Sequence, residues 1–261
     1  GIEVWCGGTA LVIYQEDGIV TAEYKGVFHK IKAKRLIVAT GASEKTLPFP
    51  NSDLPGIYGA GAVQTLMNVH GVLPGKRIVM LGAGNIGVIV AYQLLQAGVE
   101  VAAIVEGAPV IGSYWVHASK VRRCGVPIYT SHTVVAAHGK ESLEAVTIGK
   151  VDDKWQVVPG SEQTIEADGL CLSVGLSPLT ELLWQAGCDM TFVRELGGYV
   201  PWRDANLMTS KKEIFVAGDV AGVEEASAAM VEGKIAGLYA AFSLGMHLPD
   251  FQQQYQQAKG Q

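Results

Sequence analysis

The sequence predicts an α/β fold in which one type of domain occurs twice. Three observations lead to this prediction: a repeated segment, a glycine-rich turn between an apolar strand and an apolar helix, and a later apolar strand that ends in Ala-Gly-Asp. The chain has 261 residues, of which 49% are hydrophobic and 17% charged, so it can bury a substantial core.

The repeat aligns residues 31–43 with residues 165–177 without gaps, matching Ile, Ala, Leu, Gly and Ser. Both copies contain a continuously apolar strand, residues 36–39 and 170–174, of the kind that is buried on both faces of a parallel sheet. Alternating runs bounded by turn residues predict an antiparallel meander before each copy. These runs are residues 9–14, 19–24 and 27–31 in the first copy, and residues 145–148, 155–158 and 164–165 in the second.

The second copy opens with a strand at residues 78–81, a glycine turn, a helix at residues 85–97 and a strand at residues 101–105. In the turn, the first glycine permits a tight bend, the second lets a pyrophosphate approach the backbone, and the third allows the helix to pack on the strand. The residues of this predicted cofactor site are Gly82, Ala83, Gly84, Asn85, Ile86 and Gly87. A Rossmann-like unit that has lost its ligand is the alternative.

Glu106 follows the strand at residues 101–105, at the distance expected of an acid that accepts hydrogen bonds from the adenosine ribose. A 2'-phosphate would be repelled there, and no Arg follows closely. The sequence therefore favours NAD over NADP. Nothing comparable to this strand, turn and helix precedes the first meander, so we expect the first domain to lack its opening half.

Residues 213–222 form an apolar strand that leads into Ala-Gly-Asp, followed by a helix of small residues. Together with Ala39-Thr40-Gly41 and the glycine turn, this segment resembles the pyridine nucleotide-disulfide oxidoreductase superfamily of glutathione and thioredoxin reductases. The resemblance implies a discontinuous, truncated FAD domain (residues 1–67 and 183–261) and an inserted NAD domain (residues 68–182). The residues it adds to the cofactor sites are Thr40, Gly41, Ala42, Gly175, Gly218, Asp219, Glu225 and Ala226.

By this resemblance, Asp219 bonds the flavin ribitol and the helix beginning near Glu225 directs its N-terminus at the isoalloxazine ring. The alternative for Asp219 is a plain N-cap of that helix. Residues 55–64, 73–79 and 218–233 resemble one branch in particular. This branch holds the alpha subunits of sarcosine oxidase, hydrogen cyanide synthase, opine oxidase and dye-linked proline dehydrogenase.

The branch implies an FAD-dependent oxidoreductase that passes electrons between NAD(H) and flavin, as one subunit of an amine- or amino-acid-oxidising or electron-transfer complex. A non-catalytic NAD-binding or assembly module with a decayed flavin site is the alternative. The four cysteines, Cys6, Cys124, Cys171 and Cys188, form no close pair, so dithiol reduction is not expected. We expect a second subunit or a second copy as partner and a small-molecule substrate. No catalytic residue is assigned.

A net charge of -5 and the lack of a Lys/Arg block argue against a nucleic-acid partner. Residues 54–75 and 78–99 contain no charged residue, but Gly, Pro, Asn and Gln interrupt them, so no membrane span is expected. The four widely spaced cysteines favour a reducing cytoplasm, and no secretory signal is expected at the start of the chain. The histidines lack ligand spacing, which predicts no metal site. Tyr114 and Trp115 either face the nicotinamide or pack, and residues 251–261 are expected to be a solvated helix end or linker.

Overall fold

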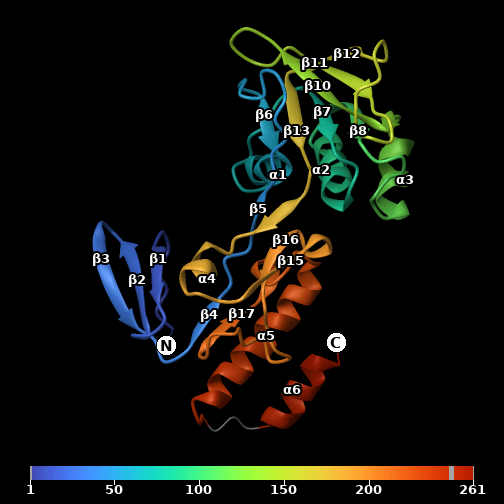
Figure 1. Cartoon of the computed structure of the whole chain (residues 1–261). Coiled ribbons are helices and arrows are strands. Elements are labelled where there is room, and N and C mark those ends of the chain that lie inside the picture. The colour runs from blue at the N-terminus through green and yellow to red at the C-terminus, as the bar shows by residue number, and fades with distance from the viewer. Residues whose placement is uncertain (1, 247–249, 261) are drawn as a thin grey trace. The chain divides into compact units, whose positions relative to one another are not determined.

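The computed structural model describes residues 2–246 and 250–260 and shows two compact units. Unit 1 comprises Gly1–Ser43 and Leu176–Gln261, and unit 2 comprises Glu44–Gly175, so one unit is inserted into the other as predicted (Figure 1). The boundaries lie earlier than the predicted 67/68 and 182/183. The first boundary is earlier because β6 (Ile57–Gly59) and α1 (Ala60–Asn68) belong to the sheet and core of unit 2. The second is earlier because β14 (Leu176–Pro178) and α4 (Glu181–Gln185) belong to unit 1, where Leu182 and Leu183 pack in the core.

A five-stranded parallel sheet forms the centre of unit 2, in the order β6-β13-β7-β8-β9. Its remaining strands are β7 (Arg77–Leu81), β8 (Glu100–Glu106), β9 (Ile128–Thr130) and β13 (Gly169–Leu172), and its further helices are α2 (Asn85–Gln96) and α3 (Trp115–Arg123). Apolar clusters cover both faces of the sheet. The chain runs outward from β7 to β9 and returns on the other side of β7 as β13. This reversal of strand order is where α/β sheets bind their ligands.

The meander of unit 2 differs from its prediction. It consists of β10 (His132–His138), β11 (Ala145–Lys150) and β12 (Gln163–Glu166), paired in sequence order. The strand predicted at residues 155–158 is wrong, and β10 was not predicted as a strand. The Asp152 carboxylate accepts hydrogen bonds from the backbone of Lys154 and Gln156, at 2.9 and 2.8 Å, and so turns the segment that was expected to be extended.

Unit 1 contains the first predicted meander, with β1 (Thr9–Tyr14), β2 (Ile19–Tyr24) and β3 (Val27–Lys32). Its β4 (Leu36–Val38) pairs in parallel with β17 (Ile214–Val216). The other strand pairs are β5 (Ala42–Glu44) with β14 (Leu176–Pro178), and β15 (Met190–Val193) with β16 (Gly198–Pro201). The helices are α4 (Glu181–Gln185), α5 (Ala226–Ser243) and α6 (Phe251–Lys259).

The glutamine-rich tail is more than a solvated helix end. In α6, Phe251 stacks on Phe242 of α5 with ring centroids 4.5 Å apart, and Ala258 is fully buried in a cluster with Phe215. The few apolar residues among the glutamines share one face, which is why the segment packs. Within residues 2–246 and 250–260, no helix is both long and apolar enough to cross a bilayer.

Candidate cofactor-binding sites

The predicted glycine turn of unit 2 joins β7 to α2. Gly82 has φ +106°, and a Cβ there would overlap the carbonyl oxygen of Ser173 at the end of β13. The backbone N–H of Gly82 donates to Val105 O of β8 at 2.7 Å. Above Gly84, by contrast, a Cβ would meet no atom within 4 Å. The turn is thus held tightly by two neighbouring strands and is open where a pyrophosphate would approach the start of α2.

Glu106, half-buried at the end of β8, points its carboxylate at this turn. Oε2 accepts a hydrogen bond from the backbone of Ala83 at 2.7 Å, and Oε1 accepts one from Ala108 at 2.8 Å. The sequence did not suggest this second role. Each carboxylate oxygen has further lone pairs, so Glu106 orders the turn and keeps acceptor capacity for hydroxyl groups beside it.

The segment after β8 folds back beside the turn. A Cβ at Gly112 would lie 3.8 Å from the Cα of Gly84, and Asn85 Oδ1 accepts a hydrogen bond from the backbone of Tyr114 at 2.9 Å. The Asn85 side chain therefore anchors the start of α3. Trp115 is 77% exposed, so the expectation that it packs is wrong, because nothing in unit 2 covers the beginning of α3.

A hollow of about 360 Å³ lies beside this segment. It is lined by Pro109, Val110, Ile111, Ser113, Trp115, Arg122, Ile128 and Thr130. The Ser113 Oγ is buried and has no hydrogen-bond partner among the residues that the structure describes. The sequence analysis considered only an Arg that closely follows Glu106, and Arg122 lies further along the chain. The structure brings it to the wall of this hollow.

Gly175 lies in the segment between β13 and β14, and β13 is on the other side of β7. Gly175 has φ +112°, and its carbonyl accepts a hydrogen bond from the backbone of Lys45 at 2.9 Å. Ser173 N donates to Leu81 O at 2.7 Å, so the ends of β7 and β13 stay together as far as the glycine turn. All the residues predicted for this site in unit 2 lie at the carboxyl ends of β7, β8 and β13.

In unit 1 the predicted flavin residues come from the ends of β4 and β17. Thr40 Oγ1 donates to Leu179 O at 2.6 Å, and Leu179 N donates to Gly41 O at 2.9 Å. Ala217 N donates to Val38 O at 3.2 Å, which keeps the two strand ends adjacent. The structure therefore brings Thr40, Gly41 and Ala42 to the same sheet edge as Gly218, and both glycines have positive φ.

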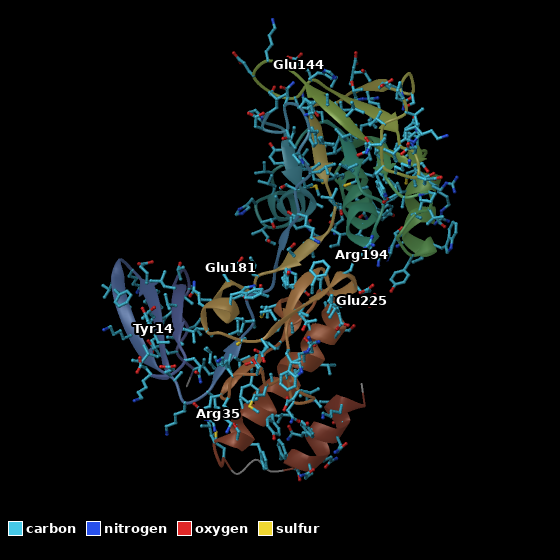
Figure 2. The ribbon with its side chains drawn as sticks, in the orientation of Figure 1. Tyr14, Arg35, Glu144, Glu181, Arg194 and Glu225 are labelled. Carbon is cyan, nitrogen blue, oxygen red and sulfur yellow. The ribbon has the colours of Figure 1, made fainter. Side chains whose placement is uncertain are left out.

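Asp219 lies in a short 3-10 turn, residues Gly218–Val220, and not at the helix start. The N-cap of α5 is Glu225, so the N-cap alternative for Asp219 is wrong. No described residue donates a hydrogen bond to the Asp219 carboxylate, and it is half-buried. Figure 2 shows Glu225 and Arg35 at opposite ends of α5, where Arg35 bonds Ser243 at 2.7 Å.

An ion pair missed by the sequence analysis fixes this turn. Glu232 of α5 accepts the Gly218 N–H at 2.8 Å and pairs with Arg203 at 3.2 Å, while Arg203 also donates to the carbonyl of Ala221. The side chains are 14% and 22% exposed. Burial raises the pKa of Glu232, and the bonds from Gly218 and Arg203 only partly oppose this. We call these contacts the Glu232 clamp.

Among the described residues, the cysteines form no pair and the possible metal ligands form no cluster. Cys171 and Cys188 are buried, which raises the pKa of both thiols, whereas Cys6 and Cys124 are exposed, and none of the four is bonded to another. No described group of three His, Cys, Asp or Glu side chains is placed to hold a metal ion. His247 lies outside the described residues.

Comparison with known proteins places this geometry in a family. The family model described as pyridine nucleotide-disulphide oxidoreductase matches residues 1–233. The chain is 28% identical over 235 residues to one of the subunits of opine oxidase from Agrobacterium tumefaciens (strain Ach5), covering 87% of this chain and 47% of that protein. It is 29% identical over 235 residues to the HcnB subunit of hydrogen cyanide synthase from Pseudomonas aeruginosa, covering 80% and 48%. The chain thus spans about half the length of these relatives.

Solved structures agree on the fold. Thioredoxin reductase from T. acidophilum superimposes with a TM-score of 0.74 at 23% identity, over 91% of this chain and 74% of that one. L-proline dehydrogenase from P. horikoshii superimposes with a TM-score of 0.67 at 23% identity, over 96% of this chain and 44% of that one. The chain belongs to the pyridine nucleotide-disulphide oxidoreductase family.

Proposed function

We propose that this chain is the dinucleotide-binding part of an FAD-dependent oxidoreductase that passes electrons between NAD(H) and flavin. One observation carries the proposal: the glycine turn of unit 2 is open above Gly84 and has the Glu106 carboxylate beside it. These are the features that a pyrophosphate and a ribose diol need. Relatives that are subunits of opine oxidase, hydrogen cyanide synthase and sarcosine oxidase support a role within an amine- or amino-acid-oxidising or electron-transfer complex.

In this proposal unit 2 holds NAD through the turn Gly82–Gly87 and Glu106. Gly175, after the neighbouring strand β13, borders the same site. The hollow beside Trp115 takes the adenosine half. Unit 1 contributes Thr40, Gly41 and Ala42 and the turn with Asp219 to an FAD site, with Glu225 and Ala226 at the start of α5. Bound nicotinamide and flavin supply the hydride chemistry, and the residues of the chain bind and orient them.

The fit to FAD is partial. The Asp219 carboxylate lacks a donor among the described residues, and it stands ready to accept hydrogen bonds from a polyol. However, the described part of unit 1 has no strand, glycine turn and helix corresponding to β7 and α2 to grip the pyrophosphate. A non-catalytic NAD-binding or assembly module whose flavin site is decayed is the second candidate.

Two binding measurements on the purified chain separate these functions. NADH is titrated and followed by energy transfer from tryptophan, and retained or added FAD is read from the visible absorption spectrum. Binding of both cofactors, followed by anaerobic bleaching of the flavin with NADH, supports the oxidoreductase. Binding of NADH alone favours the second candidate. If NADH does not bind at millimolar concentration, both are wrong.

A further inference from the structure

An exposed tryptophan lies in the turn that connects β11 to β12 in unit 2. The Trp155 N–H donates to Asp152 O at 3.0 Å, and Asp152 N donates to Gln156 O at 2.9 Å. The Asp152 carboxylate also accepts the N–H groups of Lys154 and Gln156. These bonds hold Trp155 at φ +60°, a left-handed conformation that bulky residues rarely adopt. The turn therefore fixes the direction in which this side chain leaves the backbone.

The same turn is bonded to the end of β8. Val151 N donates to Ser131 O at 2.8 Å, and Ser131 N donates to Ala108 O at 3.0 Å. Ala108 N in turn donates to Glu106 Oε1 at 2.8 Å. Three hydrogen bonds thus connect the tryptophan turn with the carboxylate that we propose to hold the adenosine ribose.

The Trp155 indole lies against Gly107, the residue that follows Glu106. A Cβ at Gly107 would lie 2.4 Å from Cζ3 and 3.1 Å from Cη2 of Trp155, so the six-membered ring of the indole takes the space of a side chain there. Only glycine leaves room for this contact. Even so, Trp155 is 65% exposed, because the described residues of unit 2 cover only part of the ring. An indole that is held in place but left uncovered is a surface on which a flat ligand can stack.

The place of this indole fits the base of the nucleotide. In the adenosine half of NAD, adenine is joined to C1' of the ribose, next to the C2' hydroxyl that an acid at the end of such a strand binds. Glu106 is that acid in the proposed function, and Gly107 with its indole follows directly. The hollow proposed for the adenosine half is lined by Pro109, two residues further on. The indole and the hollow therefore adjoin the same short segment, residues 107–109.

We propose that Trp155 is a base-binding residue of the NAD site, whose indole stacks on the adenine ring of the bound dinucleotide. The residue comes from the meander, and not from the strand, turn and helix that would hold the pyrophosphate and ribose. This proposal rests on the proposed function, because it needs the adenosine half to lie at Glu106. Removal of an aromatic ring that stacks on a base weakens binding by about tenfold.

The first test compares the dissociation constants of NADH and ADP-ribose by calorimetric titration of the 261-residue chain and its variants. ADP-ribose shares the adenosine and pyrophosphate with NADH and lacks the nicotinamide. We expect Trp155→Ala to weaken both ligands about tenfold, and Trp155→Phe, which keeps an aromatic ring, to weaken them by about threefold or less. Trp202→Ala is the control, because Trp202 is an exposed tryptophan of unit 1, and it should leave both constants unchanged.

The outcomes separate this proposal from the function on which it rests. If wild type binds both ligands and Trp155→Ala binds them equally well, the proposal is overturned and the proposed function stands. Equal weakening by Trp155→Ala and Trp155→Phe would also overturn it, since stacking would then not be the cause. If wild type binds neither ligand at millimolar concentration, the proposed function is wrong and this proposal is wrong with it.

The second test observes the indole itself and requires no loss of binding. ADP-ribose carries no nicotinamide to accept energy, so a fall in tryptophan emission when it binds reports contact with an indole. We expect this quenching to disappear in Trp155→Phe and to persist in Trp202→Phe. Gly107→Ala should reduce it as well, because its Cβ would displace Cζ3 of the indole. No quenching in wild type, or full quenching in Trp155→Phe at saturating ADP-ribose, would contradict the proposal.

Discussion

Glu106→Gln is the substitution that bears most closely on the proposed NAD site. The carboxylate accepts two backbone hydrogen bonds, from Ala83 and Ala108. Glutamine keeps one acceptor oxygen, but its amide group faces the other N–H. A hydrogen bond to a charged group contributes about 1.5–3 kcal/mol when buried, and Glu106 is half-buried, so we expect the free energy of unfolding to fall by about 1.5 kcal/mol.

The effect on binding follows from the same geometry. Loss of the charged acceptor beside the ribose is expected to weaken NADH binding by about 1.5 kcal/mol, which is about tenfold in Kd. NADPH gains by comparison, because the repulsion of its 2'-phosphate is removed. The ratio of the two dissociation constants should therefore shift by about tenfold or more towards NADPH.

The assay is calorimetric titration of wild type and variant with each nucleotide, with unfolding in urea to confirm the fold. Glu100→Gln is the matched control, because it removes the same charge at the other end of β8, where Glu100 pairs with Arg77 at the surface. We expect the control to leave both dissociation constants unchanged. If the folded Glu106→Gln variant keeps the wild-type ratio of the NADH and NADPH dissociation constants, Glu106 does not bond the ribose hydroxyls. The preference for NAD is then wrongly assigned.

Three further predictions concern the scaffold. Burial raises the pKa of the Cys171 and Cys188 thiols, so an aromatic disulfide reagent should react only with Cys6 and Cys124 in the native chain and with all four cysteines in urea. Rapid reaction of all four thiols in the native chain would contradict the buried placement. The raised pKa of Glu232 means that its protonated form is favoured in the folded state, so the stability of wild type relative to Glu232→Gln should fall as pH rises from the unfolded pKa through the raised one; a constant difference in urea unfolding would refute this. Gly82→Ala should lower the free energy of unfolding by about 3 kcal/mol or more, because the added Cβ would overlap Ser173 O at a position of positive φ. Gly237→Ala should raise it by up to about 1 kcal/mol, because a Cβ there meets no atom and the residue lies within α5. Similar melting temperatures of the two variants would count against the described turn.

The elements that were predicted correctly are those that depend on local signals. Asp17-Gly18 and Lys25-Gly26 mark the turns of the first meander, and the glycine turn lies between the predicted strand and helix. The wrong strand at residues 155–158 also has a local cause. The prediction used only the alternation of apolar and polar residues. It left out the Asp152 side chain, which accepts hydrogen bonds from the backbone that follows it and so bends the chain.

The parts of the sites that were missed depend on residues far apart in the sequence. The Glu232 clamp joins Arg203 to α5, and the paired acceptor role of Glu106 requires β8 to end beside the turn after β7. Neither has a spacing that a sequence reveals. The placement of β6 with unit 2 is of the same kind, since its partner β13 lies more than a hundred residues later.

The measurement that tests the central claim most directly is an NADH titration of the 261-residue chain observed through backbone amide shifts. Saturable 1:1 binding is predicted, with the largest shifts at Gly84, Asn85 and Ile86 at the start of α2, further shifts at Glu106, and none on β1, β2 and β3. Saturation with the largest shifts elsewhere, or no shift at millimolar NADH, would contradict the assignment of a dinucleotide site to this turn.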